Sequence, residues 1–371
     1  MILIITSIII FVLYGSLMLF YFFEWKKVIP FENKNGLPST QLSVIIAARN
    51  EEESIGPLLS ALTNQSYPSK LFEVIVVDDH STDNTADVVK QFENIKLVIL
   101  NEPGQNSYKK KAIETGILHA SGDLIVTTDA DCLPGKNWLL TLASFYQKKD
   151  AVFIAAPVVF RHQNNVLQIF QALDFLTLQG ITAVSVNSKL FGMSNGANMA
   201  YNREIFSDVG GFSGIDKIAS GDDMLLMNKI WEKDKKNIHY LLSPDAIVST
   251  SAMPTWKSFF NQRIRWASKA AYYKNFSITV VMVLVYLFNL LFPILFFAGF
   301  WISEYWFWLI GLWIGKTIIE WPFVYSVAKF YGKQRLMKYF LFFQPLHVLY
   351  TIIAGFLGQF GTYEWKGRKV K

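Results

Sequence analysis

The hydrophobic residues of this chain form long apolar runs near its ends and short β-branched runs between them. Residues 2–23 carry no charge and are long enough to cross a bilayer, which takes about 20 apolar residues. Residues 278–301, 306–327 and 339–360 are also long enough to span. The pattern predicts a membrane anchor, a middle domain and a C-terminal membrane region.

The first apolar run has two interpretations. A cleaved signal peptide would have a basic start, a shorter apolar core and a small-residue cleavage site, and none of these is evident. We therefore expect an uncleaved anchor over residues 1–27. Trp25, Lys26 and Lys27 follow the run, and tryptophan and lysine at that edge indicate the cytosolic interface.

The middle of the chain alternates short apolar runs with helical patterns. Residues 42–48 (LSVIIAA) are apolar and β-branched, as in a strand buried on both faces of a parallel sheet. The alternation predicts a doubly wound α/β domain with right-handed crossovers over residues 40–255, and ligands of such sheets bind at the carboxyl ends of the strands. Further strands are expected at 73–77, 97–100 and 123–127, with helices at 55–65, 85–92 and 110–120.

The C-terminal third has a different character. Residues 256–276 mix aromatic and basic side chains, which suits a helix lying along the membrane surface. Residues 277–371 form the membrane region and a basic tail. If all three late segments span, the basic segments 329–338 and 366–371 lie on opposite sides, against the positive-inside tendency. Segment 339–361 contains a proline and several glycines, so a span and a re-entrant element both stay open.

The composition narrows the class of protein. The 371 residues are 52% hydrophobic, and the mean hydropathy of +0.27 is high for a soluble protein. The net charge is +6, and most basic clusters adjoin apolar runs, which indicates contact with anionic lipid and argues against nucleic-acid binding. The single cysteine, Cys132, excludes an internal disulfide and a cysteine-rich metal site.

Polar residues directly follow the expected strand at 73–77. Asp79 lies at this strand end, where a carboxylate can accept hydrogen bonds from a nucleotide base or a ribose. For the nearby Thr82 and Asp83, a turn with a helix cap is the better interpretation, because Ser, Thr and Asp favour both.

A second acidic group follows the expected strand at 123–127. Asp129 and Asp131 stand at i and i+2, so both carboxylates can converge on one divalent ion. Mg²⁺ and Mn²⁺ prefer oxygen ligands and keep open positions for substrate phosphates. Such a triplet is a weak signal alone and gains weight from its place at a strand end.

Two further aspartates, Asp222 and Asp223, follow Gly221 and open an apparent helix. One interpretation is a helix N-cap that interacts favourably with the helix dipole. The other is a general base that deprotonates an acceptor hydroxyl. The residues alone do not separate the two.

The sequence QRIRW occupies residues 262–266. On a helix, Gln262, Arg265 and Trp266 stand at i, i+3 and i+4 and share one face. Arginine on that face could bind a diphosphate bidentately. The alternative is a basic interfacial helix whose side chains reach toward lipid headgroups.

Three weaker features remain, each with a structural and a functional interpretation. Lys109 begins a run of three lysines, which could neutralise phosphate or be a solvated charge run. Gly196 and Asn198 lie among small residues, where a substrate could approach the backbone or the chain could simply turn. Lys316 and Glu320 form an i, i+4 pair inside an apolar segment, and either contact a lipid head or pack as an internal pair.

Taken together, these motifs resemble the family 2 inverting glycosyltransferases with a GT-A fold. The matching segments run in the family's order over about 220 residues, and the flanking transmembrane layout also fits. The segments are ARNEEESI (48–55), DDHSTDNT (78–85), KKKAIETG (109–116), DADC (129–132), GDDMLL (221–226) and QRIRW (262–266).

The resemblance implies a role for each matching residue on the donor side. Asp79 would hold the base, by analogy a uracil, and Lys109 has the position of the family's phosphate-side lysine. Asp129 would contact the nucleotide and the metal, and Asp131 the metal, either Mg²⁺ or Mn²⁺. The remaining nucleotide-pocket residues would be Ala47, Arg49 and Glu51.

On the acceptor side, Asp223 matches the family's catalytic base, while Asp222 replaces the usual glutamate beside it. Gln262, Arg265 and Trp266 match the Gln-x-x-Arg-Trp motif, which lies beside the pyrophosphate and the acceptor in the family. Gly196 and Asn198 are expected to line the same region.

The resemblance implies transfer of a sugar from a nucleotide sugar to a lipid or glycan acceptor, with inversion. The motif occurs both in processive polysaccharide synthases and in ceramide glucosyltransferase-like lipid enzymes. Few spans follow the α/β domain, which makes a polymer channel harder to build, so we favour single transfer to a lipid. The expected location is the cytoplasmic (inner) membrane, with several spans and a cytosolic catalytic domain. The sugar and the oligomeric state are not specified.

Overall fold

The computed structural model describes residues 1–33, 38–100, 108–161, 165–216, 218, 220–273, 275–360, 363–365 and 368–370. The chain divides into two compact units. We call them the α/β unit, Ile29–Arg161 with Ser185–Ser251, and the helical unit, Met1–Val28 with His162–Val184 and Ala252–Lys371.

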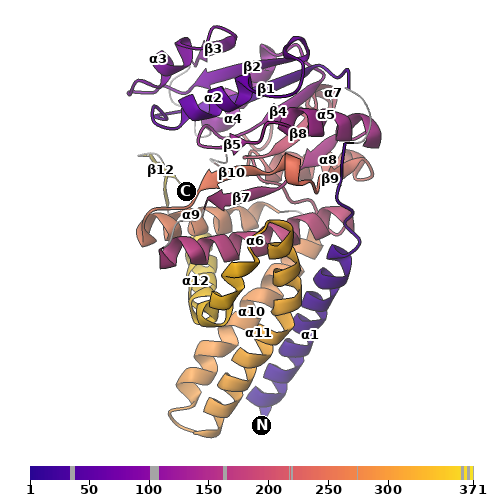
Figure 1. Cartoon of the computed structure of the whole chain (residues 1–371). Coiled ribbons are helices and arrows are strands. Elements are labelled where there is room, and N and C mark those ends of the chain that lie inside the picture. Colours follow the sequence, from indigo (N-terminus) through magenta and orange to yellow (C-terminus); the bar gives the residue numbers. More distant parts are fainter. Residues whose placement is uncertain are drawn as a thin grey trace. The chain divides into compact units, whose positions relative to one another are not determined.

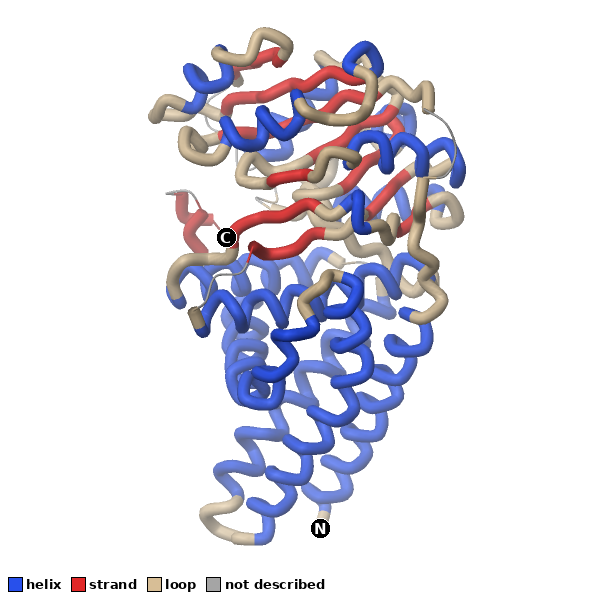
Figure 2. The backbone as a smooth tube through the Cα atoms, viewed as in Figure 1, coloured by secondary structure: helices blue, strands red, loops and turns tan. Residues whose placement is uncertain are grey.

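The α/β unit is built on a mostly parallel sheet of seven strands, in the order β3-β2-β1-β4-β8-β6-β9 (Figures 1 and 2). Strands β1 to β4 are parallel, and β8 runs antiparallel to β4 and β6. The predicted α/β fold is therefore confirmed. The strands are β1 (Leu42–Ala48), β2 (Phe72–Asp78), β3 (Ile95–Ile99), β4 (Leu124–Thr127), β6 (Phe153–Ala155), β8 (Met199–Asn202) and β9 (Ile238–Tyr240).

Helices connect these strands, and a second sheet has the order β5-β10-β7. The expected helix at 110–120 is α4, whose Gly116 packs so closely on β1 that an added Cβ would lie 2.5 Å from Ile45 Cγ2. The elements are α2 (Ile55–Thr63), α3 (Thr85–Lys90), α4 (Tyr108–Leu118), α5 (Trp138–Lys149), α7 (Arg203–Asp208), α8 (Met224–Asp234), β5 (Leu133–Pro134), β7 (Val158–Arg161) and β10 (Val248–Ser251), with short 3₁₀ turns η1 (Ser69–Leu71) and η2 (Pro244–Ala246).

The helical unit contains the segments predicted to cross a membrane. Its long helices α1, α10 and α11 run side by side (Figure 1). The elements are α1 (Ile2–Trp25), α6 (Val166–Asn187), α9 (Trp256–Ser268), η3 (Lys269–Tyr272), α10 (Phe276–Ala298), α11 (Glu304–Phe330), η4 (Gln334–Tyr339), α12 (Phe340–Phe360), β11 (Tyr363–Trp365) and β12 (Arg368–Val370).

Within the described residues, five helices are long and apolar enough to cross a membrane, and one of them, α6, was not expected. Most of α6, residues 166–184, belongs to the helical unit, although the sequence pattern placed it inside the 40–255 domain. Its apolar window is 78% buried, against 22–33% in the other four helices, so it is a core helix. At Gly180 an added Cβ would lie 2.5 Å from Val327 Cγ2 of α11, which shows how closely the two helices pack.

The last apolar segment, α12, is one continuous helix that contains Pro345. Two of its glycines permit close helix packing: an added Cβ would lie 2.9 Å from the Tyr286 ring at Gly355, and 2.6 Å from Ala267 Cβ at Gly358. These glycines are therefore explained by packing against α10 and α9. The basic tail at 366–371 falls outside the described residues, apart from the backbone of Arg368–Val370.

Candidate active site

The register of the sheet brings several predicted site residues to one edge. Ala48 at the end of β1 pairs with Asp78 at the end of β2, and β4 ends beside β1. Strand β8 is antiparallel, and its first residue Met199 pairs with Thr127, the last residue of β4. The loops after β1, β2 and β4 and the loop before β8 therefore share the carboxyl edge of the sheet, at the point where the strand order reverses.

Arg49 and Asp79 meet at this edge. The guanidinium Nη1 of Arg49 donates to the backbone oxygen of Asp79 at 2.8 Å and lies 3.7 Å from its Oδ1. Asp79 is buried and Ala47 is half-buried. The backbone N–H of Glu51 donates to the Thr85 hydroxyl at 2.7 Å, which ties the two loops together. Four of the residues expected to contact the nucleotide thus lie at or directly after two adjacent strand ends.

Asp83 and Thr82 lie in the expected turn, but the N-cap of α3 is Asn84. Asp83 Oδ1 accepts a hydrogen bond from the Thr85 backbone N–H at 3.1 Å, at the start of α3. The Thr82 N–H donates to Asn50 Oδ1 at 2.8 Å. Both residues therefore stabilise the turn between β2 and α3.

A second charged group lies around Lys109, at the start of α4. Its Nζ lies 2.7 Å from Asp129 Oδ1 and 2.9 Å from Asp222 Oδ2. Burial by itself would lower the pKa of Lys109, but the two carboxylates outweigh burial and raise the pKa above its usual value. The lysine is therefore charged at neutral pH, and the solvated charge run does not describe it.

Gly196 is part of this group because of its missing side chain. An added Cβ would lie 3.0 Å from both Lys109 Nζ and Asp222 Oδ2. A larger residue here would push the lysine and the carboxylate apart. The close approach at Gly196 is made by these two side chains, and the approach of a substrate stays a prediction.

The two adjacent aspartates differ in their surroundings. Asp222 is buried and forms the ion pair with Lys109. Asp223 is half-buried, and its carboxylate accepts from the Met224 N–H at 2.7 Å and from the Gly196 N–H at 3.2 Å. Asp223 is also the N-cap of α8, so the capping interpretation holds for its Oδ1. These two backbone hydrogen bonds orient the Asp223 carboxylate.

The Asp129–Asp131 segment suits a hard divalent cation. Ligand atoms of Asp129, Asp131 and Cys132 lie within 4.8 Å of one another. Burial, followed by the two carboxylates, raises the pKa of the Cys132 thiol, so the thiol is neutral and the hard ligands are the carboxylates. The Thr250 hydroxyl donates to Asp131 Oδ2 at 3.1 Å and orients it. Two oriented carboxylates with hard oxygen donors fit Mg²⁺ or Mn²⁺.

Asn198 differs from the expectation that it lines a substrate site. Its side chain is completely buried. Nδ2 donates to the backbone oxygens of Pro157 and Ala246, each at 2.7 Å, and Oδ1 accepts from Trp138 Nε1 at 3.0 Å. Both amide hydrogens are thereby used, so Asn198 holds the loop before β8 in place.

Two residues of the α/β site carried no usable sequence signal. Lys110 is buried, and its Nζ donates to the backbone oxygens of Ile215, Ile218 and Ser220 at 2.7–2.9 Å. It thereby anchors the loop that leads to Asp222. Arg161 of β7 donates to the Asp131 backbone oxygen at 3.3 Å. The lysine run includes Lys110 but gives no sign of this anchoring role, and no motif marks Arg161.

The QRIRW segment lies on α9, in the helical unit. A capping box between Thr255 and Ser258 starts this helix. Gln262, Arg265 and Trp266 are half-buried, whereas Arg263, which the face argument left out, is buried.

The fold is of the GT-A-like class, and comparison with known proteins agrees. Residues 43–210 match the family model described as glycosyl transferase family 2. The match covers 168 of the 371 residues, so the chain is similar to that family over this segment.

Three curated relatives are similar over much of the chain. A probable glycosyltransferase, YdaM, of Bacillus subtilis is 32% identical over 64% of this chain and 56% of its own length. A beta-monoglucosyldiacylglycerol synthase of Nostoc sp. is 27% identical over 61% of this chain and 48% of its own. A poly-beta-1,6-N-acetyl-D-glucosamine synthase of Staphylococcus epidermidis is 24% identical over 61% and 53%. The chain thus spans about half the length of these relatives.

One solved structure resembles the whole chain. It is the mannosyltransferase PcManGT of Pyrobaculum calidifontis, solved with GDP-Man and Mn²⁺. The match covers 96% of this chain and 99% of that one, with a TM-score of 0.60 at 17% sequence identity. At this identity the likeness establishes the fold.

Proposed function

We propose that this chain is a membrane-embedded inverting glycosyltransferase. It moves a sugar from a nucleotide sugar, by analogy UDP-linked, to a lipid or membrane-associated acceptor. The observation that carries the proposal is the pairing of Lys109 with Asp129 and Asp222, next to Asp223, at the carboxyl edge of the sheet. A cation held between two carboxylates, with a third, oriented carboxylate beside it, matches what removal of a diphosphate requires.

The donor would lie along the strand ends. Arg49 and Asp79 hold each other in place beside Ala47 and Glu51, so they offer a preformed edge for the base and ribose. Asp129 and Asp131 would hold the divalent ion, which supplies Lewis-acid stabilisation of the leaving diphosphate. The Mn²⁺ in the PcManGT structure supports this choice of metal.

The transfer would be a single displacement. Asp223 takes the proton of the acceptor hydroxyl while the hydroxyl oxygen attacks the anomeric carbon. The bond between that carbon and the diphosphate oxygen breaks, and the negative charge leaves with the nucleotide. Lys109 then exchanges part of its contact with the carboxylates for the phosphate. One displacement inverts the anomeric centre, so an α-linked donor gives a β-linked product.

Asp222 and Asp223 would have different roles in the transfer. Asp222 is already paired with Lys109, so it serves as the lysine's partner. Asp223 is more exposed and is oriented by two backbone N–H groups, so it is the better general base. By resemblance, Gln262, Arg265 and Trp266 would meet the diphosphate and the acceptor.

A lipid acceptor is favoured by the apolar helices and by similarity to the Nostoc synthase, whose name states a diacylglycerol product. The alternative is a processive exopolysaccharide synthase that elongates and exports a polymer. Similarity to the Staphylococcus synthase favours that second function. In either case the proposed location is the cytoplasmic membrane, with a cytosolic α/β unit.

The test is to incubate membranes containing the chain with radiolabelled UDP-glucose, UDP-N-acetylglucosamine and GDP-mannose, with Mg²⁺, with Mn²⁺ or with EDTA. We expect metal-dependent label in the organic phase and a product of inverted configuration. A long water-soluble polymer would support the alternative. Transfer with retention, or no transfer from any donor, would overturn the proposed mechanism or activity.

A further inference from the structure

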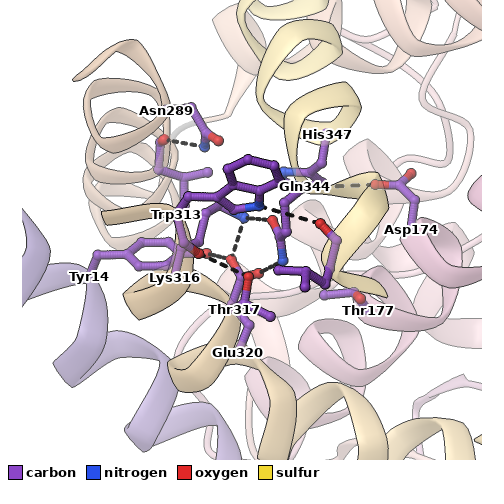
Figure 3. Close-up of polar contacts among 12 residues, drawn as sticks. Tyr14, Asp174, Thr177, Asn289, Trp313, Lys316, Thr317, Glu320, Gln344 and His347 are labelled. Atoms are coloured by element: carbon purple, nitrogen blue, oxygen red, sulfur yellow. Dashed lines mark hydrogen bonds and ion pairs between the residues drawn. The ribbon is translucent and has the colours of Figure 1, made fainter. Parts of the chain in front are cut away.

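The helix that carries Gln262, Arg265 and Trp266 is tied to its neighbours through one buried carboxylate. Asp174 of α6 lies 2.7 Å from Arg263 Nη2 of α9, and both side chains are 3% exposed. The same carboxylate accepts a hydrogen bond from the Tyr350 hydroxyl of α12. His347, also on α12, has its Nε2 4.0 Å from Asp174 Oδ1 (Figure 3). Asp174 therefore joins three helices of the helical unit.

Arg263 in turn contacts two of the motif residues. Its Nη1 donates to Gln262 Oε1 at 3.1 Å, and its guanidinium carbon lies 4.3 Å from the centre of the Trp266 ring. The Trp266 ring also packs 6.0 Å from the ring of Phe175, the residue next to Asp174. The orientations of Gln262 and Trp266 thus depend on where Arg263 is held.

Burial makes Arg263 dependent on Asp174. A guanidinium removed from water is stable only when a carboxylate and hydrogen-bond acceptors compensate its charge. The aromatic rings of Phe259, Trp266 and Tyr350 surround this cation at 4.3–6.0 Å and exclude water from the pair. Without the carboxylate, Arg263 would leave this position, and the side chains resting on it would lose their support.

We propose that Asp174 is a positioning residue for sugar transfer. It holds Arg263, and Arg263 fixes the orientations of Gln262 and Trp266 on α9. The inference rests on the proposed function, in which these two residues meet the diphosphate and the acceptor. A rigid ion pair on helices suits this task, because a misplacement of about 1 Å in a reacting group can cost about 100-fold in rate.

The test uses the full chain in lipid nanodiscs, with the donor that wild type uses in the radiolabel assay. Asp174→Asn, Arg263→Gln and the double variant are compared for kcat, donor KM and binding of UDP and GDP. We expect kcat to fall about 10- to 100-fold and nucleotide affinity to fall by a clearly smaller factor. The double variant should be no worse than Asp174→Asn, because Asp174 acts through Arg263.

Two further variants guard against loss of folding. The double variant leaves no uncompensated buried charge, so it keeps the test open if Asp174→Asn does not fold. Tyr350→Phe removes only one hydrogen bond to Asp174 and should lower kcat about two- to fivefold. Thr177→Val, one turn along α6, is the matched control, because the Thr177 hydroxyl bonds only to the Leu173 backbone oxygen among the described contacts.

The outcomes separate the two proposals. No transfer by wild type from any donor removes the proposed function itself. Transfer by wild type together with a kcat within twofold in the folded double variant overturns the role of Asp174. Equal losses of kcat and of nucleotide affinity in folded variants would also overturn it, because they indicate a general structural defect.

Discussion

The two units of this chain use charge in opposite ways. In the α/β unit, the paired side chains of Lys109 and Asp129 are 23% and 36% exposed and stand on loops and helix starts at the edge of a sheet. In the helical unit, Lys316 and Glu320 pair at 2.7 Å with 0% and 8% exposure, in the middle of α11. The first pair can exchange its partners with a ligand that arrives from water, whereas the second is almost completely buried.

The contacts around the second pair complete this contrast (Figure 3). Lys316 Nζ also donates to Gln344 Oε1 at 2.5 Å, and Gln344 Nε2 donates to Glu320 Oε2 at 2.7 Å. The Tyr14 hydroxyl of α1 donates to Glu320 as well. The pair is therefore satisfied by α1, α11 and α12, which favours the internal packing pair over contact with a lipid head. In this chain the partly exposed pair is suited to binding a ligand, whereas the buried pair is suited to stabilising the helix bundle.

The largest expected effect is on the rate of sugar transfer and concerns the partly exposed charged group of the α/β unit. Asp223→Asn should lower transfer about 10²- to 10⁴-fold, because loss of a general base has that size, while nucleotide binding and thermal unfolding stay near wild type. Initial rates with radiolabelled donor measure the loss. Asp222→Asn is the matched control and should cost less. A larger loss of transfer rate in Asp222→Asn than in Asp223→Asn would make Asp222 the general base instead of Asp223.

Substitutions in the buried Lys316–Glu320 pair should change the stability of the protein. Lys316→Met leaves Glu320 buried without its charged partner, so the free energy of unfolding should fall by about 3–5 kcal/mol. The double variant Lys316→Met with Glu320→Leu should recover most of this loss. Thermal unfolding of the full chain in detergent measures both. Lys90→Met, which breaks an exposed pair with Asp87, is the control and should cost less than about 1 kcal/mol. Equal effects would remove the contrast.

The variant Lys109→Gln tests whether the partly exposed Lys109–Asp129 pair contributes to ligand binding. Loss of a charge-assisted contact to phosphate should lower kcat/KM for the donor about 10- to 100-fold, mainly through a higher KM. Steady-state kinetics at saturating Mn²⁺ measure this. The comparison variant is Lys233→Gln in α8, whose lysine pairs with Asp208 away from the sheet edge. A purely structural Lys109 would instead show lowered stability with unchanged KM.

The smallest effect concerns pH and the α/β unit alone. Burial, followed by the charges of Lys189 and Lys149, lowers the pKa of His239 in β9 to about 4. In the unfolded chain its pKa is about 6.5, so between these values the unfolded state binds a proton that the folded state does not. Stability should fall as pH drops from about 6.5 to 4.

His239 is half-buried, so solvent screening limits the loss to about 1 kcal/mol. His239→Asn should flatten this part of the pH–stability curve, measured by thermal unfolding at several pH values. An unchanged slope in the variant would assign the pH dependence to other groups.

Much of the α/β unit follows from local patterns. Strand β1 matches the predicted range, β2 is one residue longer at each end, and β4 is one residue shorter at its start. These strands were predictable because each is an apolar β-branched run bounded by polar residues. Asp79 and Asp129 were expected at strand ends for the same reason. The sequence did not predict that helix α6 belongs to the helical unit. An apolar helix has the same sequence pattern in a soluble core and in a membrane bundle.

The sequence by itself determined which residues carry charge at the strand ends and which segments are apolar enough to leave water. These properties reside in neighbouring residues and their spacing. Only the tertiary structure decided that Lys109 meets both Asp129 and Asp222, that Asn198 is locked in the scaffold and that Arg263 is buried against Asp174. Those partners are separated by up to about 110 residues along the chain, and only strand register and helix packing bring them together.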